Sequence, residues 1–322
     1  MRALVIGAAG MVGGRLAASL AADPEPGIEA LTLVDVVEPA APAGAVPVST
    51  WVLDLTDAAA VAAAVAGRPG VIVHLAAIVS GEAEADFEKG YAVNFDGTRR
   101  LLEAIRAEPD YRPRVIFASS IAVYGAPFPE TIPEEFHLTP LTSYGTQKAM
   151  SELLLADHTR RGFLDGIGLR LPTICIRPGA PNKAASGFFS NILREPLAGR
   201  EAVLPVDDTV RHWHASPRAA VGFFRHAMRL DLERLGARRS LAMPGLSATV
   251  AEQIEALRRA AGDEAVRLIR REPDPVIRKI VAGWATRLDA SRALALGFAA
   301  DASFDAIVAA HVEDELGGRI AL

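Results

Sequence analysis

Gly7-Ala8-Ala9-Gly10-Met11-Val12-Gly13 follows a short apolar run at residues 3–6 and leads into a helical pattern over residues 12–22. Glycine lets the backbone turn sharply and approach a ligand closely, and a helix N-terminus carries partial positive charge that suits a pyrophosphate. In this strand–turn–helix setting, the spacing G-x-x-G-x-x-G predicts a dinucleotide-binding loop. The residues expected to line the loop are Gly7, Gly10, Met11, Val12 and Gly13.

Strand-like and helical patterns alternate beyond this loop. Strands are expected at residues 31–34, 49–53, 71–75, 114–118, 167–171 and 174–176, and helices from residue 57, over 95–107 and over 143–160. Such alternation predicts a parallel sheet covered by helices on both faces. The expected fold is therefore α/β, a Rossmann-type doubly wound sheet.

The composition changes after residue 177, where Pro, Gly and single aromatic residues become frequent and strand patterns become sparse. We expect residues 1–177 to form the dinucleotide-binding domain, with later strands returning to it, and residues 178–322 to form mostly a smaller substrate-binding lid. Ser247 is expected to cap a helix through Arg259, and Ser303 to open a last helix through His311.

Asp35 ends the second predicted strand, 22 residues after Gly13. An acidic residue here can accept hydrogen bonds from the adenosine ribose hydroxyls. Its charge repels a 2′-phosphate, and the neighbouring Val36 supplies no cation to offset it. The sequence therefore predicts NAD rather than NADP as cofactor, although a simple turn residue at a strand end is the alternative interpretation of Asp35.

Composition excludes several classes of partner. The chain has 322 residues and a formal net charge of -5, which gives no basic footprint for nucleic acid or an anionic membrane. No apolar run reaches the roughly 18 residues of a membrane-spanning helix, and no signal peptide precedes the first strand. We expect a cytoplasmic enzyme in which Cys175 is a buried core thiol.

His212 and His214 lack nearby acidic or thiol ligands, so no metal site is expected.

Tyr144 and Lys148 lie four residues apart and share one face of the helix predicted over 143–160. A nearby cation favours a phenolate and lowers the pKa of a tyrosine from its usual value of about 10. Tyr144 could then accept a proton from a substrate hydroxyl beside an electron acceptor. An ordinary helix with an exposed lysine and a half-buried tyrosine is the alternative.

Several ordered segments together resemble the extended short-chain dehydrogenase/reductase family, also called the nucleotide-sugar epimerase/dehydratase type. Besides the glycine loop and the Tyr-x-x-x-Lys pair, these are Asp54-Leu55, His74-Leu75-Ala76-Ala77, Asn94, Ser119–Gly125, Arg177-Pro178-Gly179, Asp289–Ala293 and Leu296-Gly297-Phe298. The resemblance extends nearly from end to end of the chain.

The resemblance implies a role for individual residues. Tyr144 would be the acid/base, and Lys148 would bind the nicotinamide ribose and tune Tyr144. Ser120 would hydrogen-bond the reacting oxygen, with Ser119 the alternative, and Asn94 would support a water-mediated proton relay. The expected cofactor contacts also include Asp54, Leu55, Leu75, Ala76 and Ala77.

The dehydratase branch of the family carries an Asp-Glu pair where this chain has Ile121 and Ala122, which counts against elimination of water. The segments at 170–190 and 211–218 instead resemble a branch that oxidises small sugar acids. Arginine can bind a carboxylate through two parallel hydrogen bonds, so Arg211 is the first candidate for the substrate carboxylate, with an interdomain salt bridge as the alternative. Candidate hydroxyl partners of the substrate are Ser80, Asn182 and Ser186.

Two other functions remain open from the sequence. One is an NAD-bound nucleotide-sugar epimerase, and the other is a non-catalytic dinucleotide sensor, although sensors of this family usually lose the Tyr or the Lys. The resemblance also implies a homodimer formed through the helices at 95–107 and 143–160.

Overall fold

The structure is a computed structural model that describes residues 1–179 and 185–321. Its centre is a seven-stranded sheet in the order β10-β6-β5-β4-β1-β2-β3, in which every recorded pair is parallel. The strands are β1 Arg2–Ile6, β2 Ala30–Asp35, β3 Val48–Val52, β4 Val71–His74, β5 Arg114–Ser120, β6 Asp165–Leu171 and β10 Ser240–Ala242. The register brings the carboxyl ends of the strands to one edge, where ligands bind in doubly wound sheets.

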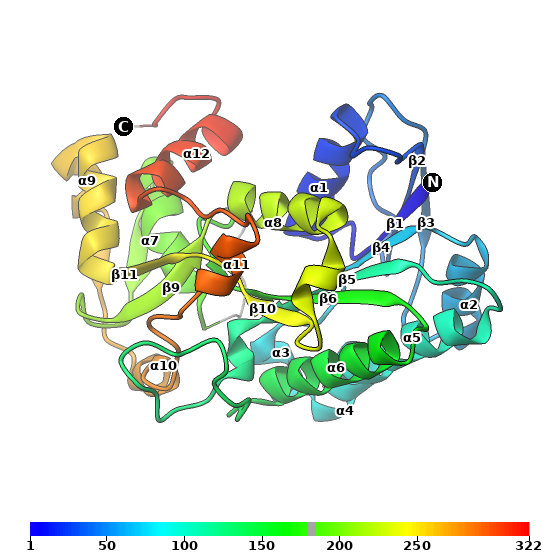
Figure 1. Cartoon of the computed structure of the whole chain (residues 1–322). Helices are drawn as coiled ribbons and strands as arrows, with labels where there is room; N and C mark the ends of the chain where they lie inside the picture. Colours follow the sequence, from blue (N-terminus) through cyan, green and yellow to red (C-terminus); the bar gives the residue numbers. More distant parts are fainter. Residues whose placement is uncertain (180–184, 322) are drawn as a thin grey trace.

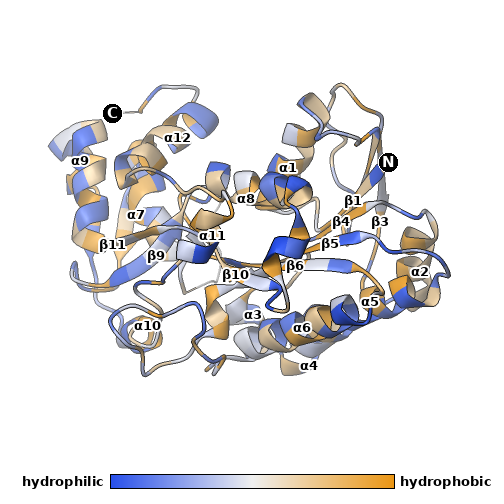
Figure 2. Cartoon of the chain, viewed as in Figure 1, coloured by the Kyte–Doolittle hydropathy of each residue, from blue (hydrophilic) through white to orange (hydrophobic). Residues whose placement is uncertain are grey.

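Helices cover both faces of this sheet (Figure 1). One face carries α1 Met11–Ala22 and α8 Pro217–Arg229, and the other carries α2 Ala58–Ala66, α5 Gly97–Ala107 and α6 Ser143–Arg160. A separate apolar cluster fills each layer. Figure 2 shows hydrophobic residues on the central strands β1 and β4, between the two helical layers. The predicted α/β, doubly wound fold is confirmed.

The C-terminal half builds a second group of elements, on the opposite side from α2 in Figure 1. A three-stranded sheet has the order β11-β9-β7, and β8 pairs with β12. This group comprises β7 Thr173–Ile174, β8 Ala202–Leu204, β9 Arg211–Ala215, β11 Leu246–Thr249, β12 Ile269–Arg271, α7 Gly187–Leu197, α9 Val250–Arg267, α10 Pro275–Val281, α11 Ser291–Ala295 and α12 Phe304–Leu316. We call it the lid; the domain boundary at residue 177 remains a proposal.

Short connecting elements complete the description. They are the helices α3 Ser80–Ala85 and α4 Phe87–Gly90, the π-helix η1 Tyr91–Asp96, and the 3₁₀ turns η2 Ile121–Val123 and η3 Leu232–Leu235. Within the ranges described, none of the helices is long and apolar enough to cross a lipid bilayer.

The structure corrects one predicted helix start. Ser247 lies inside β11, and Thr249 caps α9 through a reciprocal capping box with Glu252. Two hydroxyl residues stand close together here, and only the one with a glutamate three residues later can form the box. Strands are also more frequent in the lid than the sequence predicted. Ser303 caps α12 as expected, and that helix continues to Leu316.

Candidate active site

The glycine loop brings β1 and α1 very close together. Gly7 has a φ of 90°, and a Cβ on it would lie 2.5 Å from the backbone nitrogen of Ala76. A Cβ on Gly13 would lie 2.1 Å from the carbonyl oxygen of Gly7. Gly10 caps α1 without any side-chain hydrogen bond, so no side chain of the cap occupies the N–H groups of the first turn. This cradle fits the pyrophosphate of a dinucleotide, with Met11 and Val12 in the first turn.

Asp35 connects the end of β2 to the glycine loop. Its Oδ2 accepts a hydrogen bond from the backbone nitrogen of Ala9 at 3.0 Å, and its Oδ1 accepts one from Val36 at 2.7 Å. A carboxylate has further lone pairs, so both contacts leave it able to accept from a ribose hydroxyl. The structure thus places Asp35 beside the loop.

The other predicted cofactor residues follow the neighbouring strands. Asp54 is exposed after β3 and accepts from the backbone and hydroxyl of Thr56, both at 2.8 Å, whereas Leu55 is buried. The backbone nitrogens of Leu75 and Ala76 donate to Ile6 at 2.8 and 3.1 Å. These bonds hold the segment that follows β4 against the end of β1, beside the glycine loop. Ala77 comes next in this segment and is half-buried.

The start of α6 is fixed from two sides. The Thr142 hydroxyl accepts from the backbone nitrogen of Gly145 at 3.1 Å, and Glu84 accepts from Ser143 at 3.0 Å. A Cβ on Gly145 would lie 2.1 Å from the carbonyl oxygen of Ala122, so the helix presses directly against the turn that follows β5. This packing holds Tyr144 beside the end of β5.

Lys148 extends from α6 into the protein beneath Tyr144. Its side chain is almost fully buried, and Nζ donates to the carbonyl oxygen of Ala118 at 2.8 Å. Nζ also lies 4.7 Å from the centre of the Phe117 ring and 5.6 Å from that of Tyr144. The ammonium is therefore within cation–π range of the tyrosine.

The electrostatics differ from the prediction at Tyr144. Burial raises its pKa to about 12, although the hydrogen bond with Ser120 opposes the rise. Burial also lowers the pKa of Lys148 to about 7, against the opposing charge of Glu152. The expected depression of the tyrosine pKa is thus wrong for the protein alone, because desolvation by burial outweighs the hydrogen bond with Ser120.

The two serines at the end of β5 face different surroundings. Ser119 is buried and donates a hydrogen bond to Glu152. Ser120 is half-buried, accepts from the backbone nitrogen of Ala122 at 3.1 Å and interacts with Tyr144. The alternation of side chains along a strand separates them, and the structure groups Ser120, Tyr144 and Lys148 together.

Sequence reasoning missed a buried charge network behind this group. Arg170 on β6 pairs with Glu152, with Nη2 and Oε2 2.7 Å apart, and its Nη1 donates to the hydroxyl of Tyr124 at 2.7 Å. Glu152 also receives the Ser119 hydrogen bond. The sequence did contain one indication of this network: Glu152 is four residues after Lys148, so both side chains lie on the same face of α6.

Asn94 lies in the π-helix η1, and its side chain is fully engaged. Its Oδ1 accepts from the backbone nitrogen of Ile78 at 2.9 Å, and its Nδ2 donates to Oε1 of Gln147 at 2.8 Å. Its backbone carbonyl accepts from the Thr98 hydroxyl at 2.8 Å. Asn94 therefore ties η1 to α6, and a relay role for it remains a proposal.

The lid and α3 candidates for substrate contact each have their own surroundings in the described part of the chain. Ser186 accepts from Nη2 of Arg177 at 2.6 Å. Arg211 donates to the carbonyl oxygen of Ser247 at 2.8 Å and pairs with Glu252 at 3.3 Å, both within the lid. Ser80 is the first residue of α3. Asn182 lies outside the described residues.

The lid histidines are buried and engaged. His212 contacts the Thr173 hydroxyl at 2.7 Å and the Ala285 carbonyl oxygen at 2.9 Å, and Gln253 lies 3.0 Å from His214. Burial lowers the pKa of His212 to about 4, so the ring is neutral at pH 7. In the part of the chain that the structure describes, no three His, Cys, Asp or Glu residues are grouped as metal ligands.

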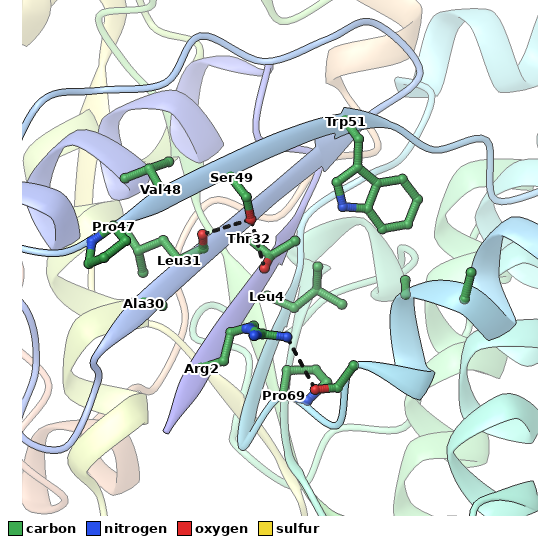
Figure 3. A pocket seen from close by; sticks show the side chains of 13 residues that line it. Arg2, Leu4, Ala30, Leu31, Thr32, Pro47, Val48, Ser49, Trp51 and Pro69 are labelled. Carbon is green, nitrogen blue, oxygen red and sulfur yellow. Dashed lines mark hydrogen bonds between the residues drawn. The ribbon is translucent and has the colours of Figure 1, made fainter.

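A hollow of about 500 Å³ lies away from this site (Figure 3). It is lined mostly by residues at the amino-terminal ends of β1, β2 and β3, including Arg2 and Val48, and by small residues of α2. Arg2 donates to the Gly67 carbonyl oxygen at 3.4 Å across it. The glycine loop and Tyr144 lie at the opposite, carboxyl ends of the strands, so this hollow does not belong to the site.

The chain is similar to several known proteins over most of its length. A model of the NAD dependent epimerase/dehydratase family matches residues 3–215. D-erythronate dehydrogenase from Cupriavidus necator is 48% identical over 323 residues, which cover 98% of each chain. D-erythronate dehydrogenase from Haemophilus influenzae is 42% identical over 98% of this chain and 100% of its own. The crystal structure described as the nucleoside-diphosphate-sugar epimerase from Agrobacterium tumefaciens is 61% identical, with a TM-score of 0.96 over 99% of this chain and 95% of that one.

Proposed function

Because the chain belongs to the NAD-dependent epimerase/dehydratase family and is an NAD-dependent oxidoreductase, we propose that it oxidises the C2 hydroxyl of a small sugar acid. The substrate we propose is D-erythronate and the product is 2-oxo-erythronate. The observation that carries the proposal is the nearly full-length similarity to two proteins named for that activity. The grouping of Tyr144, Ser120 and Lys148 supports it, because these residues supply the proton acceptor, the hydroxyl partner and the cation that the oxidation needs.

In the proposed reaction, NAD supplies the acceptor for the hydride that leaves C2. Tyr144 accepts the proton of the C2 hydroxyl, and Ser120 hydrogen-bonds the same oxygen while it becomes a carbonyl oxygen. The bonds broken are C2–H and O–H, so the products are the 2-oxo acid, NADH and one proton. The protein contributes orientation and electrostatics.

Lys148 supports Tyr144 in two ways in this proposal. Its ammonium would donate to the nicotinamide ribose hydroxyls, and its charge would favour the phenolate of Tyr144. Because the pKa of Lys148 is about 7 in the protein alone, the lysine also titrates in the range where it could pass a proton onward. Asn94, next to this group through Gln147, is the proposed start of a relay to solvent.

The test is Tyr144→Phe, followed by NADH absorbance with D-erythronate and NAD. We expect turnover to fall by at least about 100-fold, because a general base is lost, while NAD binding measured by calorimetry stays near that of the native protein. Tyr111→Phe is the matched control, since the Tyr111 hydroxyl donates to Pro69 away from the site. Native turnover by Tyr144→Phe would contradict the proposal.

A second candidate, an NAD-bound nucleotide-sugar epimerase, is favoured by the similarity to the Agrobacterium tumefaciens structure described under that name. An epimerase regenerates its oxidised cofactor in each cycle and releases no NADH. A panel of nucleotide sugars and of four- and five-carbon aldonic acids separates the two functions. Sugar interconversion without accumulation of NADH would favour the epimerase.

We also propose a homodimer in which α5 and α6 of one protomer pack against the same helices of its partner. Leu153 on α6 is 68% exposed, and Leu141, just before α6, is 65% exposed. Burying such side chains is favourable, and their exposure in a monomer has a cost. Leu153→Glu should convert the dimer to a monomer in sedimentation analysis, whereas Leu294→Glu, at a 54% exposed lid position, should not.

A further inference from the structure

Arg177 lies in the lid, six residues after the chain leaves the carboxyl end of β6. The last residue of β6, Leu171, is the register partner of Ser120 on β5. The chain then forms β7, which pairs with β9 of the lid, and reaches Arg177 three residues later. The guanidinium is thus carried by the segment that leaves the sheet directly beside the proposed catalytic serine.

The Arg177 side chain is half-buried and lacks an acidic partner among residues 1–179 and 185–321. Its Nε is buried and has no hydrogen-bond partner there. Burial lowers its pKa, the Cys175 thiol opposes this change, and the nearby cation Arg194 lowers the pKa further. Residues 180–184 contain no Asp or Glu, so they cannot supply a carboxylate side chain.

A buried guanidinium without a counter-charge is costly, because desolvation is not repaid by a partner. Other arginines of the lid have such partners. Arg194 pairs with Glu195 at 2.7 Å, and Arg259 contacts Asp305 at 2.7 Å. Among the described residues, Arg177 therefore differs from these arginines in having no acidic partner, and an incoming anion would neutralise its charge.

The surrounding helix holds Arg177 in a fixed position. The Ser190 hydroxyl on α7 accepts from its backbone nitrogen at 3.0 Å, and Arg194 donates to its carbonyl oxygen at 2.8 Å. The Ser186 hydroxyl accepts from its Nη2 at 2.6 Å. A side chain ordered before the ligand arrives loses little entropy on binding, so this arrangement favours a binding role.

We propose that Arg177 is the cation that binds the carboxylate of the sugar-acid substrate and so selects acids over neutral polyols. This inference rests on the proposed sugar-acid oxidation. A carboxylate matches the planar fork of a guanidinium and would supply the missing negative charge. Arg211, the candidate from the sequence, already has the carboxylate of Glu252 at 3.3 Å.

The experiment compares D-erythronate with its amide, a neutral isostere that keeps all of the hydroxyl groups. The measured quantity is the ratio of kcat/KM for the acid to kcat/KM for the amide. Arg177→Met should lower this ratio by on the order of 30-fold, the range of a lost charge-assisted hydrogen bond. Arg177→Lys should recover part of it. Arg259→Met, a paired arginine outside the site, is the matched control and should leave the ratio unchanged.

A binding measurement keeps the test independent of turnover. Calorimetric titration of sodium D-erythronate into the NAD complex of Tyr144→Phe, with and without Arg177→Met, should show weaker binding by a similar factor in the double variant. Thermal unfolding of each variant checks that the lid remains folded.

The outcomes separate the two levels of the proposal. Native protein that oxidises no sugar acid would overturn the proposed function itself. Native activity combined with an unchanged acid-to-amide ratio and unchanged acid binding in Arg177→Met would leave the function intact and overturn the assignment of Arg177. The same would follow if Arg211→Met, and not Arg177→Met, abolished the preference for the acid.

Discussion

Nζ of Lys148 donates a hydrogen bond to the carbonyl oxygen of Ala118 at 2.8 Å, which ties the first half of helix α6 to strand β5 two residues before Ser120. The bond leaves the ammonium two further protons to donate, and its pKa is lowered to about 7 because the group is buried. The site therefore has a charge whose presence depends on pH near neutrality.

This titration predicts a pH-dependent stability. The folded pKa of Lys148, about 7, lies below the usual lysine value of 10.5. The unfolded chain therefore binds more protons between these values, and the native protein gains stability as pH rises through that window. Relative to Lys148→Met, it should gain about 2 kcal/mol between pH 7 and pH 9. Urea unfolding of both NAD-free proteins measures this, and parallel pH curves would show that Lys148 does not titrate there.

The two serines of β5 should respond differently to substitution. Ser120→Ala should lower kcat/KM by about 100-fold, as for loss of one donor to a developing charge, with nearly native stability. Ser119→Ala leaves buried Glu152 with one hydrogen bond fewer and should lower the free energy of unfolding by about 1–2 kcal/mol. Steady-state kinetics and chemical unfolding of both variants provide the comparison. The reverse pattern would assign the substrate contact to Ser119.

Asp35 should decide the choice between NAD and NADP. Combining Asp35→Ser with Val36→Arg removes the charge that repels a 2′-phosphate and adds a cation, so kcat/KM for NADP relative to NAD should rise by on the order of 100-fold. Because Asp35 also accepts from Ala9, Asp35→Asn is the control that retains an acceptor for the loop. Native protein with a clear NADP preference would contradict the role of Asp35.

Buried histidines should make the protein sensitive to acid. Burial lowers the pKa of His74 to about 3 and that of His212 to about 4, below the usual histidine value of 6.5. As pH falls below about 6.5 the unfolded chain takes up protons that the folded protein does not. Stability should therefore drop by about 1.4 kcal/mol per pH unit for each histidine down to its folded pKa. Measuring the free energy of unfolding at pH 7.5 and 5.5 gives the loss of stability. His212→Gln should reduce its slope against pH by the contribution of one histidine, about 1.4 kcal/mol per pH unit.

The sequence predicted the parts of the fold that depend on local patterns. Helix α6 begins and ends at the predicted residues 143 and 160, because a long helical pattern marks it; the structure adds that Thr142 caps its start. The helix start at Ser247 was wrong because local hydroxyl residues near Thr249 carry similar capping signals. The short strands of the lid were missed, because two to five residues give too little periodicity.

The site was less predictable, because burial depends on distant segments. The rise of the Tyr144 pKa comes from desolvation, which no spacing of residues expresses. Arg177 appears in the sequence as part of the Arg177-Pro178-Gly179 segment, and only the folded chain shows that it lacks an acidic partner among the described residues. Glu152 and Arg170, 18 residues apart in sequence, meet only when α6 packs on β6.

The seventh strand of the central sheet has a consequence for how the chain can be synthesised and divided. Because β10 pairs with β6 and α8 lies against α1, the nucleotide-binding half is completed by residues 217–242. A nascent chain halted after residue 177 would present an open strand edge and an uncovered apolar helix, both prone to aggregation. About three quarters of the chain must therefore be synthesised before the nucleotide-binding half can fold completely.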